Sequence, residues 1–145
     1  MLVDSQLLFS DAQDLSAIST SGASTNLIDF GSARDMGVGE QLYVVLIVDT
    51  ALTDASSNST VTVDLYADST TSFTPDASRT LFTIAATAAA GTKYIAPIPP
   101  DVADYQYLEL YFTMNNGDLT TGAVTAFITK DIDKFDAYPD NVTIS

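Results

Sequence analysis

The sequence predicts an all-β protein built as an antiparallel sandwich or barrel. Three observations support this fold class: apolar residues recur with a period of two, turn signals separate the periodic segments at roughly regular spacing, and no helical segments alternate with them. The chain has 145 residues, of which 46% are hydrophobic, so it is long enough for one domain with a substantial core. We therefore expect a single β-sandwich domain over residues 1–130 and a segment of different character over residues 131–145.

Two-residue periodicity marks eight expected strands, at residues 6–10, 25–30, 42–49, 61–68, 80–85, 92–96, 105–114 and 124–130. The strand at 61–68 alternates cleanly between apolar and polar residues, which indicates one buried and one outward face. Both faces of the strand at 42–49 are apolar, so we expect it to be covered on both sides. Three prolines between residues 97 and 100 end strand pairing there. The Ala-rich stretch at 85–90 is too short for a stable helix and is interpreted as a loop or a single turn.

The absence of two residue types restricts the chemistry that this chain can perform. The sequence contains no histidine and no cysteine, so it has no imidazole base, no thiolate nucleophile and none of the usual nitrogen or sulfur ligands of zinc. We therefore predict no catalytic residue, no cofactor site and no metal site. The expected class is a binding or structural protein rather than an enzyme.

The charge of the chain restricts its partners. Five Lys and Arg residues stand against 19 Asp and Glu residues, which gives a formal net charge of −14. Such a chain lacks the clustered cations that bind nucleic acid phosphates or anionic membrane surfaces. A chain this acidic is expected to lie outside, rather than inside, a structure that contains a polyanion, because like charges repel. The N-terminal residues lack the basic start and the apolar stretch of a secretory signal, so we expect synthesis in a cytoplasm.

Three groups of carboxylates invite a calcium interpretation, because Ca²⁺ takes clustered oxygen ligands. They are Asp131 with Asp133 and Asp136, Asp11 with Asp14, and Asp64 with Asp68. None of them follows the spacing of an EF-hand loop, so we interpret them as solvated acids at strand ends.

Outward-facing aromatic and apolar side chains give the one positive signal for function. Several tyrosines share one face of the strand at 105–114, and a second apolar strip follows the strand at 42–49. Large apolar patches are rare on monomers, so either another segment of this chain or a separate partner covers these faces, and both interpretations stay open. Residues 131–145 look like an arm that lies on a neighbouring surface. The candidate interface residues are Tyr43, Val45, Ile47, Tyr66, Tyr105, Tyr107, Tyr111, Phe127, Phe135, Tyr138, Val142 and Ile144.

Three stretches in the first third of the chain point to a family. They are Phe9-Ser10-Asp11-Ala12-Gln13, Ser24-Thr25-Asn26-Leu27-Ile28-Asp29-Phe30-Gly31, and Arg34-Asp35-Met36-Gly37-Val38-Gly39-Glu40 leading into Leu42-Tyr43-Val44-Val45. Together they resemble the small capsid cement, or decoration, proteins of short-tailed bacteriophages. The resemblance implies a jelly-roll subunit. Together with the eight strands and the C-terminal arm inferred from the residues, it predicts an antiparallel eight-stranded jelly-roll sandwich with a C-terminal arm. It also implies binding to the outer surface of an icosahedral phage head, often as dimers that bridge neighbouring major capsid subunits. The expected location is therefore the outside of the virion, after synthesis in the host cytoplasm.

Two other functions remain alternatives. A carbohydrate-binding or receptor-binding β-sandwich module could use Glu109, which lies between Tyr107 and Tyr111 in the sequence. A glycosidase that uses carboxylates is the third possibility, because paired acids can hydrolyse glycosides. The absence of tryptophan counts against both, since sugar sites usually carry tryptophan platforms beside their acids.

Overall fold

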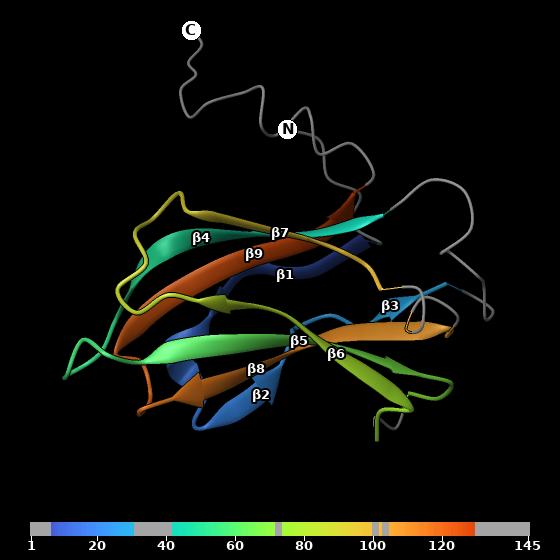
Figure 1. Ribbon diagram of the computed structural model, residues 1–145, viewed down its shortest axis with the longest axis horizontal. Helices are drawn as coiled ribbons and strands as arrows, with labels where there is room; N and C mark the ends of the chain where they lie inside the picture. The colour runs from blue at the N-terminus through green and yellow to red at the C-terminus, as the bar shows by residue number, and fades with distance from the viewer. Residues whose placement is uncertain (1–6, 31–41, 72–73, 100–101, 103–104, 130–145) are drawn as a thin grey trace, which may run out of the picture.

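The computed structural model describes residues 7–30, 42–71, 74–99, 102 and 105–129, and these form a sandwich of two sheets (Figure 1). Its strands are β1 (Leu8–Asp14), β2 (Ser21–Ala23), β3 (Ile28–Asp29), β4 (Tyr43–Thr53), β5 (Thr60–Asp68), β6 (Ala77–Ile84), β7 (Lys93–Pro97), β8 (Tyr107–Asn115) and β9 (Thr121–Thr129). One 3-10 turn, η2 (Leu15–Ala17), follows β1. Among the described residues, no helix has the length and apolarity of a membrane span.

The two sheets are antiparallel and interleave along the chain. Sheet A has the strand order β1-β9-β4-β7, and sheet B has the order β2-β8-β5-β6 with β3 also paired to β8. Strands β2 and β3 both pair with β8, one near each end, so they act as a single interrupted strand. With these two counted as one, each sheet has four strands, and the order is that of an eight-stranded jelly roll. The prediction of an antiparallel, all-β sandwich is confirmed.

Ser24 accounts for the interruption between β2 and β3. Its backbone N–H donates to the carbonyl oxygen of Leu110 at 2.8 Å, as a strand residue would. Its hydroxyl then accepts the backbone N–H of Leu110 at 3.1 Å and donates to the carbonyl oxygen of Asn26 at 2.9 Å. The side chain of Ser24 therefore replaces a missing strand partner, and the buried N–H of Leu110 stays hydrogen-bonded.

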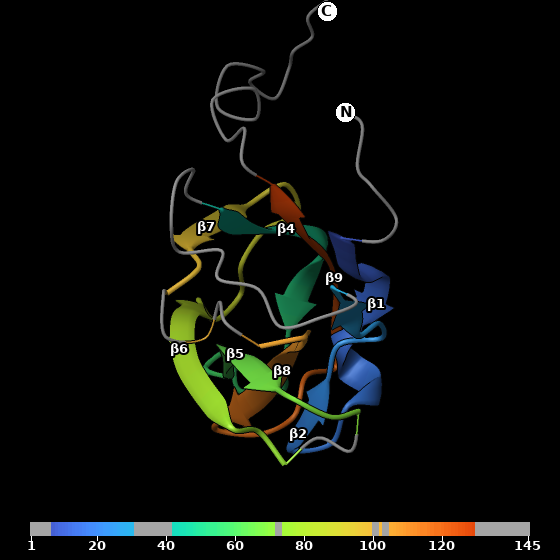
Figure 2. The same cartoon turned by 90° about the vertical axis from the view of Figure 1, so that its right-hand side faces the viewer.

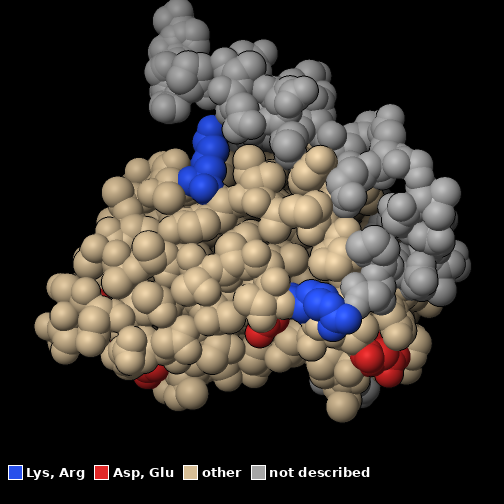
Figure 3. Space-filling model, in the orientation of Figure 1, with Lys and Arg blue, Asp and Glu red and all other residues tan. Residues whose placement is uncertain are grey.

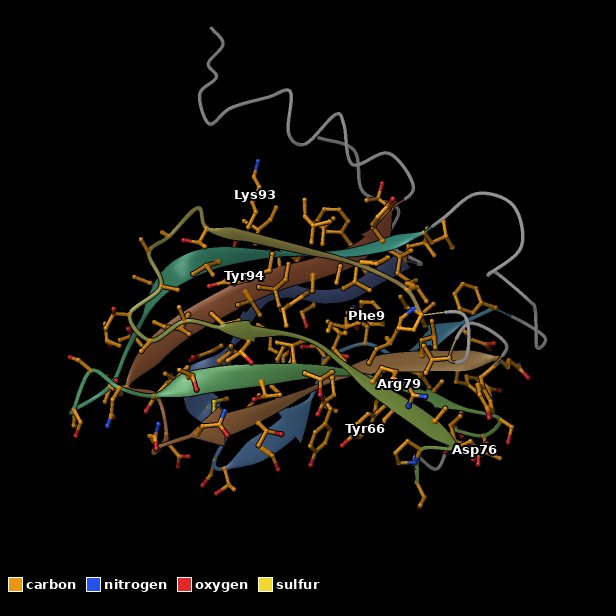
Figure 4. All side chains as sticks on the ribbon, in the orientation of Figure 1. Phe9, Tyr66, Asp76, Arg79, Lys93 and Tyr94 are labelled. Carbon is orange, nitrogen blue, oxygen red and sulfur yellow. The ribbon has the colours of Figure 1, made fainter. Side chains whose placement is uncertain are left out.

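The core lies between the sheets, where Figure 4 shows Phe9. The inward residues are those that the alternating pattern predicts. At most 1% of the surface is exposed at each of them: Val44, Leu46 and Val48 on β4, Val61, Val63 and Leu65 on β5, and Leu108, Leu110 and Phe112 on β8. Viewed from the side, the sandwich has β6 and β7 at one edge and β1 and β2 at the other (Figure 2). The rings of Phe82 and Tyr94 stack at 5.4 Å between β6 and β7 and link the two sheets there.

Several strand limits differ from the expected ones for local reasons. Strand β1 continues to Asp14 because register shifts between Leu8 and Gln13 take up additional residues, and Ala12 adopts a positive φ of 49°. Strand β4 continues past Asp49 to Thr53, again through register shifts against β9. The short strand β2 was not expected, because Ser21–Ala23 carries no apolar alternation. Residues 131–145, the expected arm, lie outside the described residues.

Candidate interaction surfaces on the two sheets

The outer face of sheet A carries a row of apolar side chains that crosses all four strands. Leu8 on β1 pairs with Phe127 on β9, Phe127 pairs with Val45 on β4, and Val45 pairs with Ile95 on β7. Val45 is 0% exposed and Phe127 is 1% exposed, although neither belongs to the core between the sheets. We call this row, with its neighbours Tyr43 and Ile47, the apolar face. It brings together four of the predicted interface residues: Tyr43, Val45, Ile47 and Phe127.

The centre of the apolar face is already shielded from solvent within a single chain, because Val45 and Phe127 are as buried as core residues. Leu8, Tyr43, Ile47 and Ile95 are only half-buried. A partner on this face therefore gains contact area mainly from the half-buried side chains that surround the centre.

The outer face of sheet B is chemically different. Asp64, Tyr66 and Asp68 on β5 pair with Tyr111, Glu109 and Tyr107 on β8, and we call these six residues the acidic aromatic face. The rings of Tyr66 and Tyr111 stack with centroids 4.8 Å apart and planes 9° apart. The hydroxyl groups of Tyr111 and Ser21 are hydrogen-bonded at 3.0 Å. Figure 4 shows Tyr66 projecting from sheet B, away from sheet A.

The carboxylates of this face differ in burial and in hydrogen bonding. Asp64 accepts a hydrogen bond from the hydroxyl of Thr80 at 2.6 Å. Asp68 is only 3% exposed, and its Oδ1 accepts the backbone N–H and the hydroxyl of Thr70 at 2.8 and 3.1 Å. Glu109 is half-buried; burial raises its pKa above the ordinary value, and the negative charge of Asp68 raises it further.

The pKa of Tyr66 responds to the same surroundings. Burial raises it above the ordinary value, and the negative charge of Asp64 adds to this effect, with smaller contributions from Tyr111 and Glu109. The raised pKa keeps the phenol of Tyr66 neutral beside the ionised carboxylates around neutral pH. The face combines aromatic surface with negative charge and has no balancing cation on β5 or β8, whose sequences contain neither Lys nor Arg.

One predicted member of the tyrosine face lies elsewhere. Tyr105 precedes the start of β8, is partly buried and packs against the core, so the expectation that it shares a face with Tyr107 and Tyr111 is wrong. The reason is that the strand begins at Tyr107, and period-two alternation does not extend before it. Phe135, Tyr138, Val142 and Ile144 lie outside the described residues.

Of the four described acids considered for calcium, Asp14, Asp64 and Asp68 accept hydrogen bonds that hold local structure, and Asp11 is exposed. Asp14 caps η2 by accepting the backbone N–H and the hydroxyl of Ser16 at 2.9 and 2.6 Å, and these bonds lower its pKa. Within the described residues, no group of three or more Asp or Glu side chains is placed to hold a metal ion. Asp131, Asp133 and Asp136 lie outside them.

The charged groups that Figure 3 shows are unevenly distributed. The acidic groups seen in this view lie in its lower part, the largest of them where Figure 4 labels Asp76, and the basic groups lie where Figure 4 labels Lys93 and Arg79. Most of the surface seen in this view carries no charge.

Comparison with known proteins gives a family and a distant structural likeness. A chain from the solved structure of infectious bursal disease virus, Gx strain, is 13% identical and has a TM-score of 0.49, with 84% of this chain covered. This chain spans only 30% of that one. No match is found among curated proteins. The model of the Bbp16 family matches residues 9–128, which is most of the chain, and the protein therefore belongs to the Bbp16 family of phage proteins.

Proposed function

We propose that this protein is a capsid cement protein of a phage particle. It binds the outer surface of an icosahedral head and stabilises the shell by bridging neighbouring major capsid subunits. Membership of a phage protein family and the jelly-roll strand order support this proposal. So do the three stretches of sequence that resemble cement proteins.

The apolar face is the single observation that carries the proposal. Around its buried centre, half-buried apolar side chains on β1, β4 and β7 leave apolar area on the outside of sheet A that a partner can cover. We assign it to self-association, with a second copy as the partner in a dimer. Tyr43, at the border of the apolar face, adds aromatic area of the kind that interface centres favour.

The net charge supports a position outside the shell. At −14, each copy is repelled by packaged DNA, so the outer surface of a head is electrostatically preferable to the inner one. Many copies on a regular lattice also need little affinity each, because linked contacts raise the effective concentration of the next one.

A binding experiment with purified heads tests the proposal. The heads come from a strain that lacks this protein, and added wild-type protein is expected to co-sediment with them and to raise the temperature at which they release DNA. Cryo-electron microscopy of the complex is expected to show added density outside the shell. Heads that bind no protein at saturating concentration would overturn the proposal.

A pair of variants tests the assignment of the apolar face. Ile47→Lys places a charge on this face, and Thr83→Lys places the same charge on the exposed outer side of β6. Analytical ultracentrifugation is expected to show a dimer for the wild type and for Thr83→Lys, and a monomer for Ile47→Lys. A wild type that stays monomeric at high micromolar concentration would contradict self-association.

A truncation tests the expected arm. We propose that residues 131–145 reach a neighbouring copy or the shell through Phe135, Tyr138, Val142 and Ile144. A chain that ends at residue 130 is expected to fold with an unchanged melting temperature and to bind heads more weakly. Equal binding by the truncated and full chains would remove the arm from the proposal.

A further inference from the structure

The turn between β8 and β9 contains the only Asn-Gly pair of the sequence, Asn116 and Gly117. Both residues are exposed, and they have positive φ angles of 67° and 111°, as Asn-Gly turns commonly do. Asparagine is a thermolabile residue, because the backbone nitrogen of the next residue can attack its side-chain amide. A following glycine has no side chain to hinder this attack. The dipeptide therefore favours Asn116 over the other asparagines as a site of this reaction.

The attacking nitrogen is accessible in the structure. Within the described residues, the backbone N–H of Gly117 donates no hydrogen bond. The hydrogen bonds that hold the turn engage its carbonyl groups instead, because the hydroxyl of Ser59 donates to the carbonyl oxygen of Gly117 at 2.9 Å and to that of Asn116 at 3.4 Å. A Cβ at Gly117 would meet only the oxygen of the Ser59 hydroxyl, at 3.8 Å. The nitrogen is thus exposed, and the space around it is open.

The side chain of Asn116 is held more loosely than that of its neighbour Asn115. The Nδ2 of Asn116 donates to the carbonyl oxygen of Asn58 at 3.3 Å. The Nδ2 of Asn115 contacts three oxygens of Thr60 and Thr62, the nearest at 2.9 Å. Asn116 must rotate to bring its Cγ to the nitrogen, and it then leaves a left-handed conformation that costs energy for any residue with a Cβ. The rotation breaks one long hydrogen bond and relieves this cost.

A second asparagine with a small following residue shows the opposite environment. Asn58 is exposed, but Ser59, which would supply the attacking nitrogen, is 0% exposed. The backbone N–H of Ser59 also points to the carboxylate of Asp54, with 3.4 Å between nitrogen and Oδ1. The two turns lie side by side, since Asn116 donates to Asn58. The fold therefore protects one asparagine and leaves the other open to attack.

We propose that Asn116 is a site of spontaneous deamidation in the folded protein. The backbone nitrogen of Gly117 forms a bond to Cγ of Asn116, the bond from Cγ to Nδ2 breaks, and Nδ2 leaves as ammonia with the proton of the attacking nitrogen. Water then opens the five-membered succinimide ring at either carbonyl. Opening at Cγ gives aspartate, and opening at the backbone carbonyl gives isoaspartate. No oxidant, metal or enzyme takes part, and the inference is independent of the proposed function.

The modified turn connects three loops at one end of the sandwich. Asp118 accepts the backbone N–H of Thr20 at 2.8 Å and the hydroxyl of Ser19 at 3.1 Å, which ties the β8–β9 turn to the segment before β2. The hydroxyl of Ser59, in the β4–β5 loop, donates to Gly117 at 2.9 Å. Isoaspartate lengthens the backbone by one atom and displaces these acceptors. Aspartate only adds one charge. We therefore expect the isoaspartate form to be the less stable product.

Peptide mapping of the purified full chain tests the proposal. The native protein is incubated at neutral and at mildly alkaline pH, digested, and analysed by mass spectrometry for the mass difference between an amide and a carboxyl group. We expect this change at Asn116 several-fold faster than at Asn26, Asn58 or Asn115. The rate is expected to rise with pH, because removal of the proton from the backbone nitrogen makes it a better nucleophile.

Two glycine variants separate the geometry of the site from general strain. Gly117→Ala places a methyl group beside the attacking nitrogen, and Gly91→Ala places one in a different turn, where φ is also positive at 91° and nothing lies within 4 Å. Gly117→Ala is expected to slow the change at Asn116 several-fold, and Gly91→Ala is expected to leave its rate unchanged. Equal rates in the two variants would overturn the role assigned to Gly117.

Two outcomes with the wild-type protein would overturn the proposal as a whole. One is a native chain that stays unmodified at Asn116 while the chain unfolded in urea reacts, because the fold then protects the site. The other is an equal rate at Asn58, because burial of the attacking nitrogen then makes no difference. The expected effect on stability has its own test. The isoaspartate fraction should melt at a lower temperature than Asn116→Asp, and equal melting temperatures would contradict the connecting role of the turn.

Discussion

The two outer faces of the sandwich are built on sheets of the same size and differ in almost every chemical property. The apolar face of sheet A has Val45 and Phe127 at its centre, and both are buried as completely as core residues. The acidic aromatic face of sheet B has Tyr66 and Glu109 at its centre, both half-buried. Both faces follow from the same alternation along their strands, in which one side chain points to the core and the next points outward.

The difference shows that the outward positions of a sandwich can carry two unlike surfaces without disturbing the core between them. On sheet A the outward positions add a second layer of apolar packing. On sheet B they add charge that finds no cation on β5 or β8. Stability and recognition can thus be changed on one face while the other stays intact, and the predictions below use this separation.

The largest expected contrast comes from removing one ring on each face. Phe127→Ala deletes a ring that is 1% exposed, and we expect it to lower the free energy of unfolding by about 3 kcal/mol. Tyr111→Ala deletes a half-buried ring with one stacked partner, and we expect a loss of about 1 kcal/mol. Urea denaturation of both variants measures the contrast. Equal losses would show that the apolar face is not packed like a core.

A smaller effect is expected at the interrupted edge strand of sheet B. Ser24→Ala leaves the backbone N–H of Leu110 without an acceptor, and we expect a loss of roughly 2 kcal/mol. Ser21→Ala on β2 removes only the bond to the hydroxyl of Tyr111, which water can replace, and is expected to cost about 0.5 kcal/mol or less. Thermal unfolding of the two variants gives the comparison, and a larger loss for Ser21→Ala would contradict the role assigned to Ser24.

Salt is expected to strengthen self-association through the apolar face. Raising sodium chloride from about 0.05 to about 0.5 M screens the repulsion between copies that each carry a formal charge of −14, so self-association should tighten several-fold. Sedimentation at both salt concentrations measures the response. Weaker association at the higher concentration would contradict the assignment of the apolar face.

The smallest effect concerns Glu109 and its dependence on pH. Its pKa in the folded protein is raised above the ordinary value of 4.5, so ionising this carboxyl costs folding free energy. The cost is absent below pH 4.5, where the group is protonated in both states, and develops as the pH rises through the raised pKa. Glu109→Gln should therefore be more stable than the wild type by roughly 0.5 kcal/mol at pH 7 and equally stable at pH 3. A gain at pH 7 that Asp11→Asn matches would attribute the effect to net charge alone.

The fold could be predicted from the sequence where alternation is long and regular. The inward residues of β4, β5 and β8 are those that the pattern indicates, because a buried face fixes the register of a strand. The pattern missed β2, whose residues Ser21–Ala23 are small, carry no β-branched side chain and are held by pairing with β8. It also missed the shifts in β1, since a bulge breaks the period on which the prediction depends.

The candidate surfaces could be predicted only in part. Alternation placed Tyr43, Val45 and Ile47 opposite the core-facing side of β4, and the structure agrees with this placement. Alternation could not reveal that Phe127 and Val45 are neighbours. The residues that pair across two strands distant in the sequence cannot be inferred from the pattern of either strand alone. It also treated Asp68 as a solvated acid, whereas this side chain is 3% exposed and bonded to Thr70. An Asp followed two residues later by Thr is the local signal for such a turn.

The position of β9 has a consequence for the timing of assembly. This strand, at residues 121–129, lies between β1 and β4, so the earliest and the latest strands of the described chain are direct neighbours. A growing polypeptide on the ribosome can form the β5–β6 hairpin early. In sheet A, however, β1 and β4 have no strand between them until β9 has emerged as far as residue 129. The row from Leu8 to Ile95 is continuous only once Phe127 has joined it. A half-made subunit therefore lacks the complete apolar face, so the self-association proposed above would be restricted to finished molecules.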